Sequence, residues 1–349
     1  MFTYLFLCIL PFLCALIFPE YAYNTKQKKR YLIFCAIVMI VVLGLRSRTV
    51  GSTDTNNYYR MMIRALAAPN WGAFYFDGGV EKGFQYFVFL LSRVFSDPQW
   101  ILIVSSVIVV VCNLYSISQN TDNLPIAILM FVTLGLMTFE MQAMRQAIAM
   151  SLCLVAYEQV KKEKSIRFFI WVILASLFHR TAVVFLPVYF LRKLSLSTKD
   201  LLLFGTLAIV FLFSSTKVIG IANDLFDESY DVAVEHGGFV ATAIYVLITV
   251  YAYCFCKQSL TDEKGRLAFY VLLTGMVCYV IRYIGALAAE RVSFYFMFAQ
   301  NIVLARAIEK ESKANQIIMA SVVFVLCILL FVYRMRSSDL VPYRFFTYA

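Results

Sequence analysis

The chain has 349 residues, of which 62% are hydrophobic and 15% charged, and its mean hydropathy is +0.77. Soluble domains carry about 25% charged residues, so this composition excludes a soluble protein and indicates a membrane protein with several spans. The net charge is +10, but the basic residues stand in short segments beside apolar runs. That distribution is typical of topology signals rather than of a nucleic-acid surface, so no nucleic-acid partner is expected.

Apolar runs recur along the whole chain, and several are close to the ~17 residues that the shortest transmembrane helices need. The first lacks a basic segment before it and a small-residue cleavage site, so it is expected to be a transmembrane helix and not a signal peptide. The runs lie at 2–18, 31–45, 84–96, 99–117, 124–139, 145–160, 167–191, 200–217, 239–256, 267–285, 287–305 and 315–333.

Basic clusters between these runs predict which loops are cytoplasmic. They lie at 26–30, 161–167, 192–199, 257–266 and 306–313. Between two cytoplasmic loops the number of crossings must be even, and five runs separate the first two clusters. The shortest, 84–96, is therefore expected to be a half-helix that dips in from outside. By the same count, 167–191 is expected to be a broken hairpin interrupted at His179 and Arg180.

The predicted fold is all-α: a polytopic transmembrane bundle with about ten full spans plus broken or re-entrant half-helices. Residues 1–349 form a single transmembrane domain, and 46–83 and 218–238 become its external loops. The second loop is acidic and has no Lys or Arg, as expected of a translocated segment. The nine cysteines lie mostly in apolar runs and are expected to be small hydrophobes, and Cys254 and Cys256 have no nearby Cys/His pair for a metal.

Arginines at the predicted outer edge need an explanation, because the positive-inside rule predicts few there. The planar guanidinium suits bidentate contact with phosphate oxygens, which favours a diphosphate-bearing ligand at this edge. Contact with anionic lipid head groups is the alternative, and it is favoured for Arg60, Arg64, Arg334 and Arg336. The full set is Arg46, Arg48, Arg60, Arg64, Arg145, Arg291, Arg334 and Arg336.

Two arginines stand out by their position. Arg145 opens a helical run, where its charge opposes the positive helix N-terminus unless an anion lies there. Arg282 is embedded in an apolar run and must face the bundle interior or a cavity. An internal ion pair, for example of Arg282 or Arg291 with Glu290, is the alternative to a ligand site.

Three further residues have both a structural and a chemical interpretation. His179, beside Arg180, is either a satisfied structural histidine or a functional one. Asp54 or Thr53 reads as the N-cap of a helix from about residue 55, which leaves a chemical role for Asp54 open. Glu81 precedes the half-helix and is either its cap or a general base.

Several short polar motifs recur along the chain. They are Arg48-Thr-Val-Gly-Ser-Thr-Asp54-Thr-Asn-Asn-Tyr58, Glu81-Lys-Gly83-Phe84, Met144-Arg145-Gln-Ala-Ile-Ala149, Leu177-Phe-His179-Arg-Thr-Ala182, Arg291-Val-Ser-Phe-Tyr295 and Val341-Pro-Tyr343. Their order and approximate spacing, over most of the chain, resemble the EpsG family of polysaccharide polymerases. The members of that family are Wzy-type integral membrane proteins of bacterial exopolysaccharide, capsule and O-antigen clusters.

The resemblance implies an enzyme that joins oligosaccharide repeat units, each carried on undecaprenyl diphosphate, at the outer face of the bacterial cytoplasmic membrane. The growing chain passes from its lipid diphosphate to the non-reducing end of the next unit, without a nucleotide sugar, metal or other cofactor. The expected partners are the undecaprenyl-diphosphate-linked oligosaccharide, membrane lipid, a chain-length regulator and a flippase.

In chemical terms, arginines would hold the charge of the leaving diphosphate, and a base would take the proton of the attacking sugar hydroxyl. Asp54 and His179 are favoured among the candidate catalytic residues, which are Asp54, Glu81, His179 and Glu290. The candidate substrate-binding residues are Arg46, Arg48, Tyr58, Arg145, Arg180, Arg282, Arg291, Tyr295 and Tyr343.

Four other classes stay open at this point. A flippase of lipid-linked sugars would also need interior arginines, but it is expected to have more full spans. An O-antigen ligase is expected to have one very large outer loop. A membrane acyltransferase is expected to combine its catalytic histidine with acyl-donor binding on the cytoplasmic side. A purely structural membrane partner would carry the cost of intramembrane charges without a function.

Overall fold

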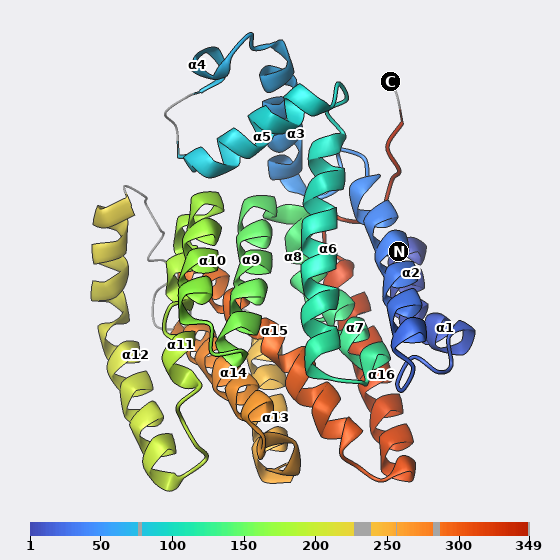
Figure 1. Ribbon diagram of the computed structural model, residues 1–349, viewed down its shortest axis with the longest axis vertical. Coiled ribbons are helices and arrows are strands. Elements are labelled where there is room, and N and C mark those ends of the chain that lie inside the picture. Colours follow the sequence, from blue (N-terminus) through green and yellow to red (C-terminus); the bar gives the residue numbers. More distant parts are fainter. Residues whose placement is uncertain (76–78, 227–238, 256, 282–286, 348–349) are drawn as a thin grey trace.

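The computed structural model describes residues 1–75, 79–226, 239–255, 257–281 and 287–347 (Figure 1). These residues form sixteen α-helices and two 3-10 helices. The elements are α1 (Phe2–Ile17), α2 (Thr25–Gly44), α3 (Ser52–Ala67), α4 (Trp71–Phe74), α5 (Lys82–Val94), α6 (Trp100–Asn120), α7 (Leu124–Thr133), α8 (Leu136–Gln142), α9 (Met144–Lys161), α10 (Ser165–Phe178), η1 (Arg180–Phe185), α11 (Val188–Leu191), α12 (Thr198–Phe226), α13 (Phe239–Phe255), η2 (Lys257–Leu260), α14 (Glu263–Ile281), α15 (Leu287–Glu309) and α16 (Lys313–Met335).

The all-α prediction is confirmed, but about ten full spans are not. Within the described residues, three helices are long and apolar enough to cross a membrane, namely α6, α14 and α16. The bent pair α7 and α8 gives a fourth candidate if the two helices count as one span. Other apolar helices, such as α1 and α10, are shorter than 18 residues. Length and composition therefore support three or four spans.

The predicted run 124–139 is divided at Gly135, which the sequence did not indicate. Gly135 adopts φ +100°, and α7 and α8 meet at an angle of 42°. A Cβ at this position would lie 2.6 Å from Nη2 of Arg334. Glycine is therefore favoured here both by the left-handed backbone and by the close approach of a guanidinium from α16.

The helices α3, α4 and α5 gather at one end of the bundle (Figure 1). Two of them fall inside the predicted external loop 46–83, so that segment is largely helical. The predicted half-helix corresponds to α5, whose 13 residues are too short to span a membrane. In Figure 1, α5 lies across the end of the bundle instead of dipping into it. We call the end of the bundle where α3, α4 and α5 gather the α5 end. The second predicted loop, 218–238, begins within α12, and 227–238 lie outside the described residues.

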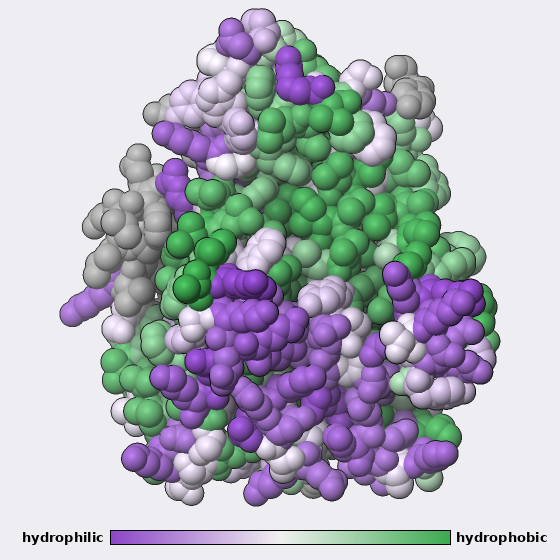
Figure 2. All heavy atoms as spheres, in the orientation of Figure 1, coloured by the Kyte–Doolittle hydropathy of each residue, from purple (hydrophilic) through white to green (hydrophobic). Residues whose placement is uncertain are grey.

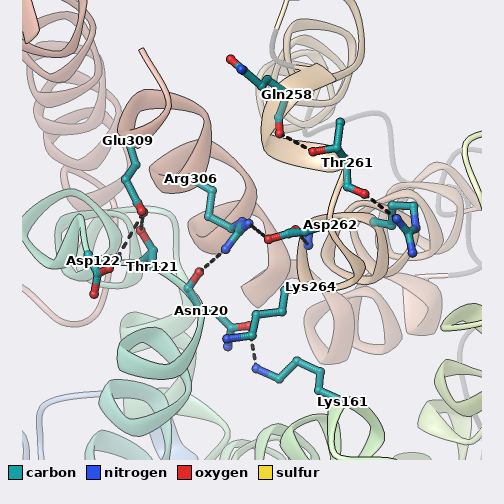
Figure 3. A network of polar contacts seen from close by, with 12 residues as sticks. Asn120, Thr121, Asp122, Lys161, Gln258, Thr261, Asp262, Lys264, Arg306 and Glu309 are labelled. Atoms are coloured by element: carbon teal, nitrogen blue, oxygen red, sulfur yellow. Dashed lines mark hydrogen bonds and ion pairs between the residues drawn. The ribbon is translucent and has the colours of Figure 1, made fainter. Parts of the chain in front are cut away.

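Basic connections meet at the opposite end, which we call the basic end. Figure 3 shows Asn120 at the centre of a polar network there. Its side chain accepts a hydrogen bond from Lys161 (2.7 Å), and its backbone oxygen accepts one from Arg306 (2.9 Å). Arg306 also pairs with Asp262, and Lys264 donates to the carbonyl of Gln119 (3.3 Å). The network ties α6, α9, α14 and α15 together.

The surface is divided along the same axis. On the face drawn in Figure 2, hydrophobic residues gather between the two ends, and hydrophilic residues cover the part toward the basic end. This is the pattern expected of a bundle whose middle contacts apolar solvent.

Candidate active site

Glu81 lies immediately before α5 and joins three segments through its carboxylate. Oε1 is 2.9 Å from Nδ1 of His179 and accepts the backbone N–H of Arg180 at 3.1 Å. Oε2 accepts a hydrogen bond from Nη1 of Arg145 at 2.5 Å. One carboxylate therefore connects the start of α9, the start of α5 and the break after α10.

The predicted break at His179 and Arg180 is confirmed, and it positions the histidine. The helix α10 ends at Phe178, His179 is extended (φ −156°, ψ 117°), and η1 begins at Arg180. The start of α5 approaches this break closely, since a Cβ on Gly83 would lie 2.4 Å from the carbonyl oxygen of Leu177. Glycine at position 83 thus allows the contact between Glu81 and His179.

Burial separates the three side chains into one that is hidden and two that are accessible. The side chain of Glu81 is 4% exposed, whereas those of His179 and Arg145 are 15% and 23% exposed. Burial alone would raise the pKa of Glu81, but the hydrogen bond with His179 and the charge of Arg145 bring it down to about 2. Glu81 is therefore a carboxylate at neutral pH and a weak base, which suits orientation of its partners better than proton abstraction.

Tyr58 on α3 completes the cluster from a fourth segment. Burial raises the pKa of Tyr58, and the positive charge of Arg145, together with a hydrogen bond to it, opposes that shift. Its ring packs edge-on against Phe84, with centroids 5.4 Å apart. Asp54 lies one turn earlier on α3, is exposed, and acts electrostatically on Tyr58.

The predicted cap of α3 is wrong by a few residues. Gly51 occupies the N-cap with φ +102°, and Asp54 falls in the first helical turn. A Cβ on Gly51 would lie 2.4 Å from the carbonyl oxygen of Met141 in α8. Glycine is therefore favoured at position 51, where the chain enters the helix. An acidic residue in the first turn still complements the helix dipole.

The helix α15 borders the site through two hydrogen bonds. Gln146 donates to the backbone oxygen of Arg291 at 2.6 Å, and the hydroxyls of Thr181 and Tyr295 are 3.1 Å apart. The side chain of Arg291 is exposed, whereas Tyr295 is buried. The backbone of Arg291 thus lies beside Gln146, the residue after Arg145, and the buried Tyr295 contacts η1.

Two predicted residues belong to a different cluster, in which Arg46 is buried and Tyr343 is half-buried. Arg46 is 1% exposed and donates to the carbonyl of Leu43. The hydroxyl of Tyr343 donates to the carbonyl of Val42 at 2.7 Å, and an isolated bridge pairs Arg46 with Phe345. These contacts fasten the C-terminal segment to the end of α2, which is a structural role.

The remaining candidates are placed as follows. Arg48 is exposed, with its guanidinium 5.4 Å from the centre of the Tyr59 ring. The backbone of Arg180 contacts Glu81. Arg282 and the side chain of Glu290 lie outside the part of the chain that the structure describes. Gly83, Gln146 and Thr181 were not predicted as site residues, although each lies in a motif that contains a candidate and within two residues of it.

Comparisons with known proteins identify the family of the chain. No curated protein and no solved structure matches the chain. The model of the EpsG family matches residues 29–345, which include every residue of the Glu81 cluster. The chain therefore belongs to the EpsG family, which is linked to exopolysaccharide biosynthesis.

Proposed function

We propose that the protein polymerises oligosaccharide repeat units carried on undecaprenyl diphosphate, at the outer face of the bacterial cytoplasmic membrane. The observation that carries the proposal is the Glu81 cluster, in which one buried carboxylate holds an imidazole and a guanidinium side by side. This pairs a general base with a cation for a leaving diphosphate, the two groups that such a transfer needs.

His179 serves as the base. With Nδ1–H donated to Glu81, the tautomer leaves Nε2 as an acceptor for the proton of the attacking sugar hydroxyl. The hydroxyl oxygen then forms a bond to C1 of the donor sugar, and the bond from C1 to the diphosphate oxygen breaks. The proton resides on Nε2, and the diphosphate leaves with the electron pair.

Arg145 serves as the diphosphate ligand. Its Nη1 contacts Glu81 and the carbonyl of Gly79 (3.3 Å), and a guanidinium has five N–H donors in all. The donors that remain would bind the phosphate oxygens as charge develops on them. Arg291, whose backbone lies beside Gln146, is the second cation available to the same anion.

The proposed orientation follows from the charges. The basic end holds Lys161, Lys264 and Arg306 and would face the cytoplasm by the positive-inside rule. The α5 end, with Glu81 and His179, would then face outward, where translocated lipid-linked units are available.

The experiment is deletion of the gene in its native cell, followed by complementation and analysis of lipid-linked glycans together with surface polymer. Deletion is expected to abolish polymer and to leave single repeat units exposed on the outer face. His179→Asn keeps a donor toward Glu81 but lacks Nε2, so it should behave like the deletion. Ser176→Ala, a change at a partly exposed residue of α10 outside the Glu81 cluster, should restore polymer.

Other outcomes would overturn the proposal. Repeat units trapped on the inner face would indicate transport, and intact polymer that fails to reach its final acceptor would indicate a ligase. Unchanged glycans would exclude polymerisation. Normal polymer with His179→Asn would exclude His179 as the base.

A further inference from the structure

A second concave site lies at the α5 end, outside the Glu81 cluster. It has a volume of about 570 Å³, within the ~300–1,000 Å³ typical of small-ligand pockets. Its walls come from the loop after α2, from α3, from the turn between α5 and α6, and from the C-terminal segment. We call it the Tyr59 pocket, after the residue that α3 contributes.

Backbone and side-chain hydrogen bonds fix the walls of the Tyr59 pocket. The N–H of Ser47 donates to the carbonyl of Arg344, and the N–H of Phe346 donates to the carbonyl of Leu45, both at 2.8 Å. On the other side, Nε2 of Gln99 donates to the carbonyls of Gly44 (2.7 Å) and Arg46 (2.9 Å). Contacts between segments far apart in the sequence therefore hold the walls of the pocket, including the wall that the C-terminal segment contributes.

The lining has the chemistry of a site for neutral polar molecules. Arg48 and Asp97 carry opposite charges, so the pocket does not favour a polyanion such as a diphosphate. Four serine and threonine side chains contribute hydroxyls, while Tyr59 and Phe346 contribute aromatic surface. Gln99 is 2% exposed, and its Oε1 has no hydrogen-bond partner among the described residues. A buried acceptor without a donor is unusual and points to a ligand or water that supplies one.

We propose that the Tyr59 pocket binds a sugar residue of the oligosaccharide substrate, at a distance from the bond that is made. Sugar hydroxyls match the serine, threonine, Asp97 and Gln99 groups, and the apolar faces of a pyranose match the aromatic rings. The identification of the ligand as this oligosaccharide rests on the proposed function. The pocket itself rests on the contacts above.

The position of α3 relates this pocket to the Glu81 cluster. Tyr58 contacts Arg145, whereas Tyr59, the next residue, lines the pocket. Successive helical residues point about 100° apart, so α3 stands between the two sites. The pocket therefore acts as a specificity-determining site that recognises a remote sugar, and its loss should raise KM more than it lowers kcat.

The test uses the purified full-length protein and one probe, the free repeat-unit oligosaccharide released by mild acid from the deletion strain. Binding is measured by titration calorimetry and saturation-transfer NMR. Tyr59→Ala removes the aromatic surface. Asp97→Asn keeps the acceptor that caps the N–H of Gln99 (2.7 Å) and removes only the charge. Each is expected to weaken binding at least about tenfold, consistent with loss of one stacked ring or one charged hydrogen bond.

Tyr86→Ala is the control, because Tyr86 is an exposed aromatic residue at the same end but outside the pocket. It should bind the oligosaccharide like the wild type, and unfolding temperatures would verify that all variants fold. Unchanged binding in both pocket variants overturns the inference, as does absence of binding to the wild type or displacement of the sugar by inorganic pyrophosphate. Failure of the proposed function would appear separately, as normal polymer with His179→Asn.

Discussion

Replacing Glu81 by glutamine tests whether one carboxylate organises the active site. The side chain keeps its size, and its Oε1 can still accept from Nδ1 of His179. Its amide NH₂ group, however, faces Nη1 of Arg145, where two donors would meet. The variant therefore removes the charge and one partner without creating a cavity.

The expected loss of unfolding free energy in Glu81→Gln follows from the pKa of Glu81. The pKa of Glu81 falls from the ordinary 4.5 to about 2, and one unit corresponds to ~1.4 kcal/mol, so its ionised form gains about 3 kcal/mol from the fold. Screening is small because the side chain is 4% exposed. Glu81→Gln should therefore lower the free energy of unfolding by up to about 3 kcal/mol. The polymerisation rate should fall by about 100-fold if the same interactions hold His179 and Arg145 for the reaction.

The assay is thermal unfolding in detergent, combined with the rate of polymer formation in membrane vesicles supplied with lipid-linked units. Asp122→Asn is the matched control. It breaks the exposed ion pair with Lys28 at the basic end and should cost at most about 1 kcal/mol. A Glu81→Gln variant that unfolds and polymerises like Asp122→Asn would refute the reasoning.

The pH dependence and a double variant sharpen the same test. Because the pKa of Glu81 is lowered by folding, its stabilisation is present above pH ~4.5 and is lost as the pH falls toward 2. The difference in unfolding free energy between the wild type and Glu81→Gln should thus be constant near neutral pH. It should become smaller as the pH falls from about 4.5 toward 2, where Glu81 becomes protonated. In a background of His179→Asn, Glu81→Gln should lower the rate less than it does in the wild type, because the part of its effect that passes through the imidazole is already lost and only the part through Arg145 remains. Fully additive losses would mean that Glu81 acts independently.

Three other substitutions have distinct expected outcomes. Arg145→Lys should lower the rate in vesicles at least about tenfold with little change in unfolding temperature, because an ammonium pairs with Glu81 but lacks the bidentate fork; normal polymer length would remove Arg145 as the diphosphate ligand. Gly83→Ala should destabilise the fold by about 1–3 kcal/mol and reduce polymer, since the new Cβ meets the backbone of Leu177; an unchanged unfolding temperature would contradict that packing. Arg334→Ala should leave polymer yield on surface-glycan gels near normal, and a complete loss would mean that the site lies elsewhere.

Much of the helical architecture could be predicted because lipid and close packing both demand long apolar runs. The predicted run 145–160 matches α9 within one residue at each end, and the interruption at His179 followed from the cost of charged residues within an apolar run. The break at Gly135 could not be predicted, because its reason is a guanidinium from α16 nearly 200 residues later in the chain. Sequence periodicity carries no information about such a contact.

The candidate site was predictable as a set of residues but not as an arrangement. Glu81, Arg145 and His179 each stood out by residue type and position, yet nothing in their spacing indicated that one carboxylate contacts both the guanidinium and the imidazole. Arg46 stood out for the same reasons, and the structure buries it beside the C-terminal segment, away from Glu81. That separation depends on a backbone pairing between residues 45–47 and 344–346, which no local pattern encodes.

In this geometry, a structural role of Glu81 and His179 is compatible with the chemical role proposed for them. Breaking an apolar helix leaves backbone donors without partners, which is costly away from water. At this break, Oε1 of Glu81 accepts the backbone N–H of Arg180 and also contacts the imidazole of His179. The group that satisfies the interrupted backbone is therefore the group that selects the histidine tautomer. A substitution at Glu81 should accordingly change stability and rate together, whereas His179→Asn, which keeps a donor toward that carboxylate, should change the rate while leaving the break intact.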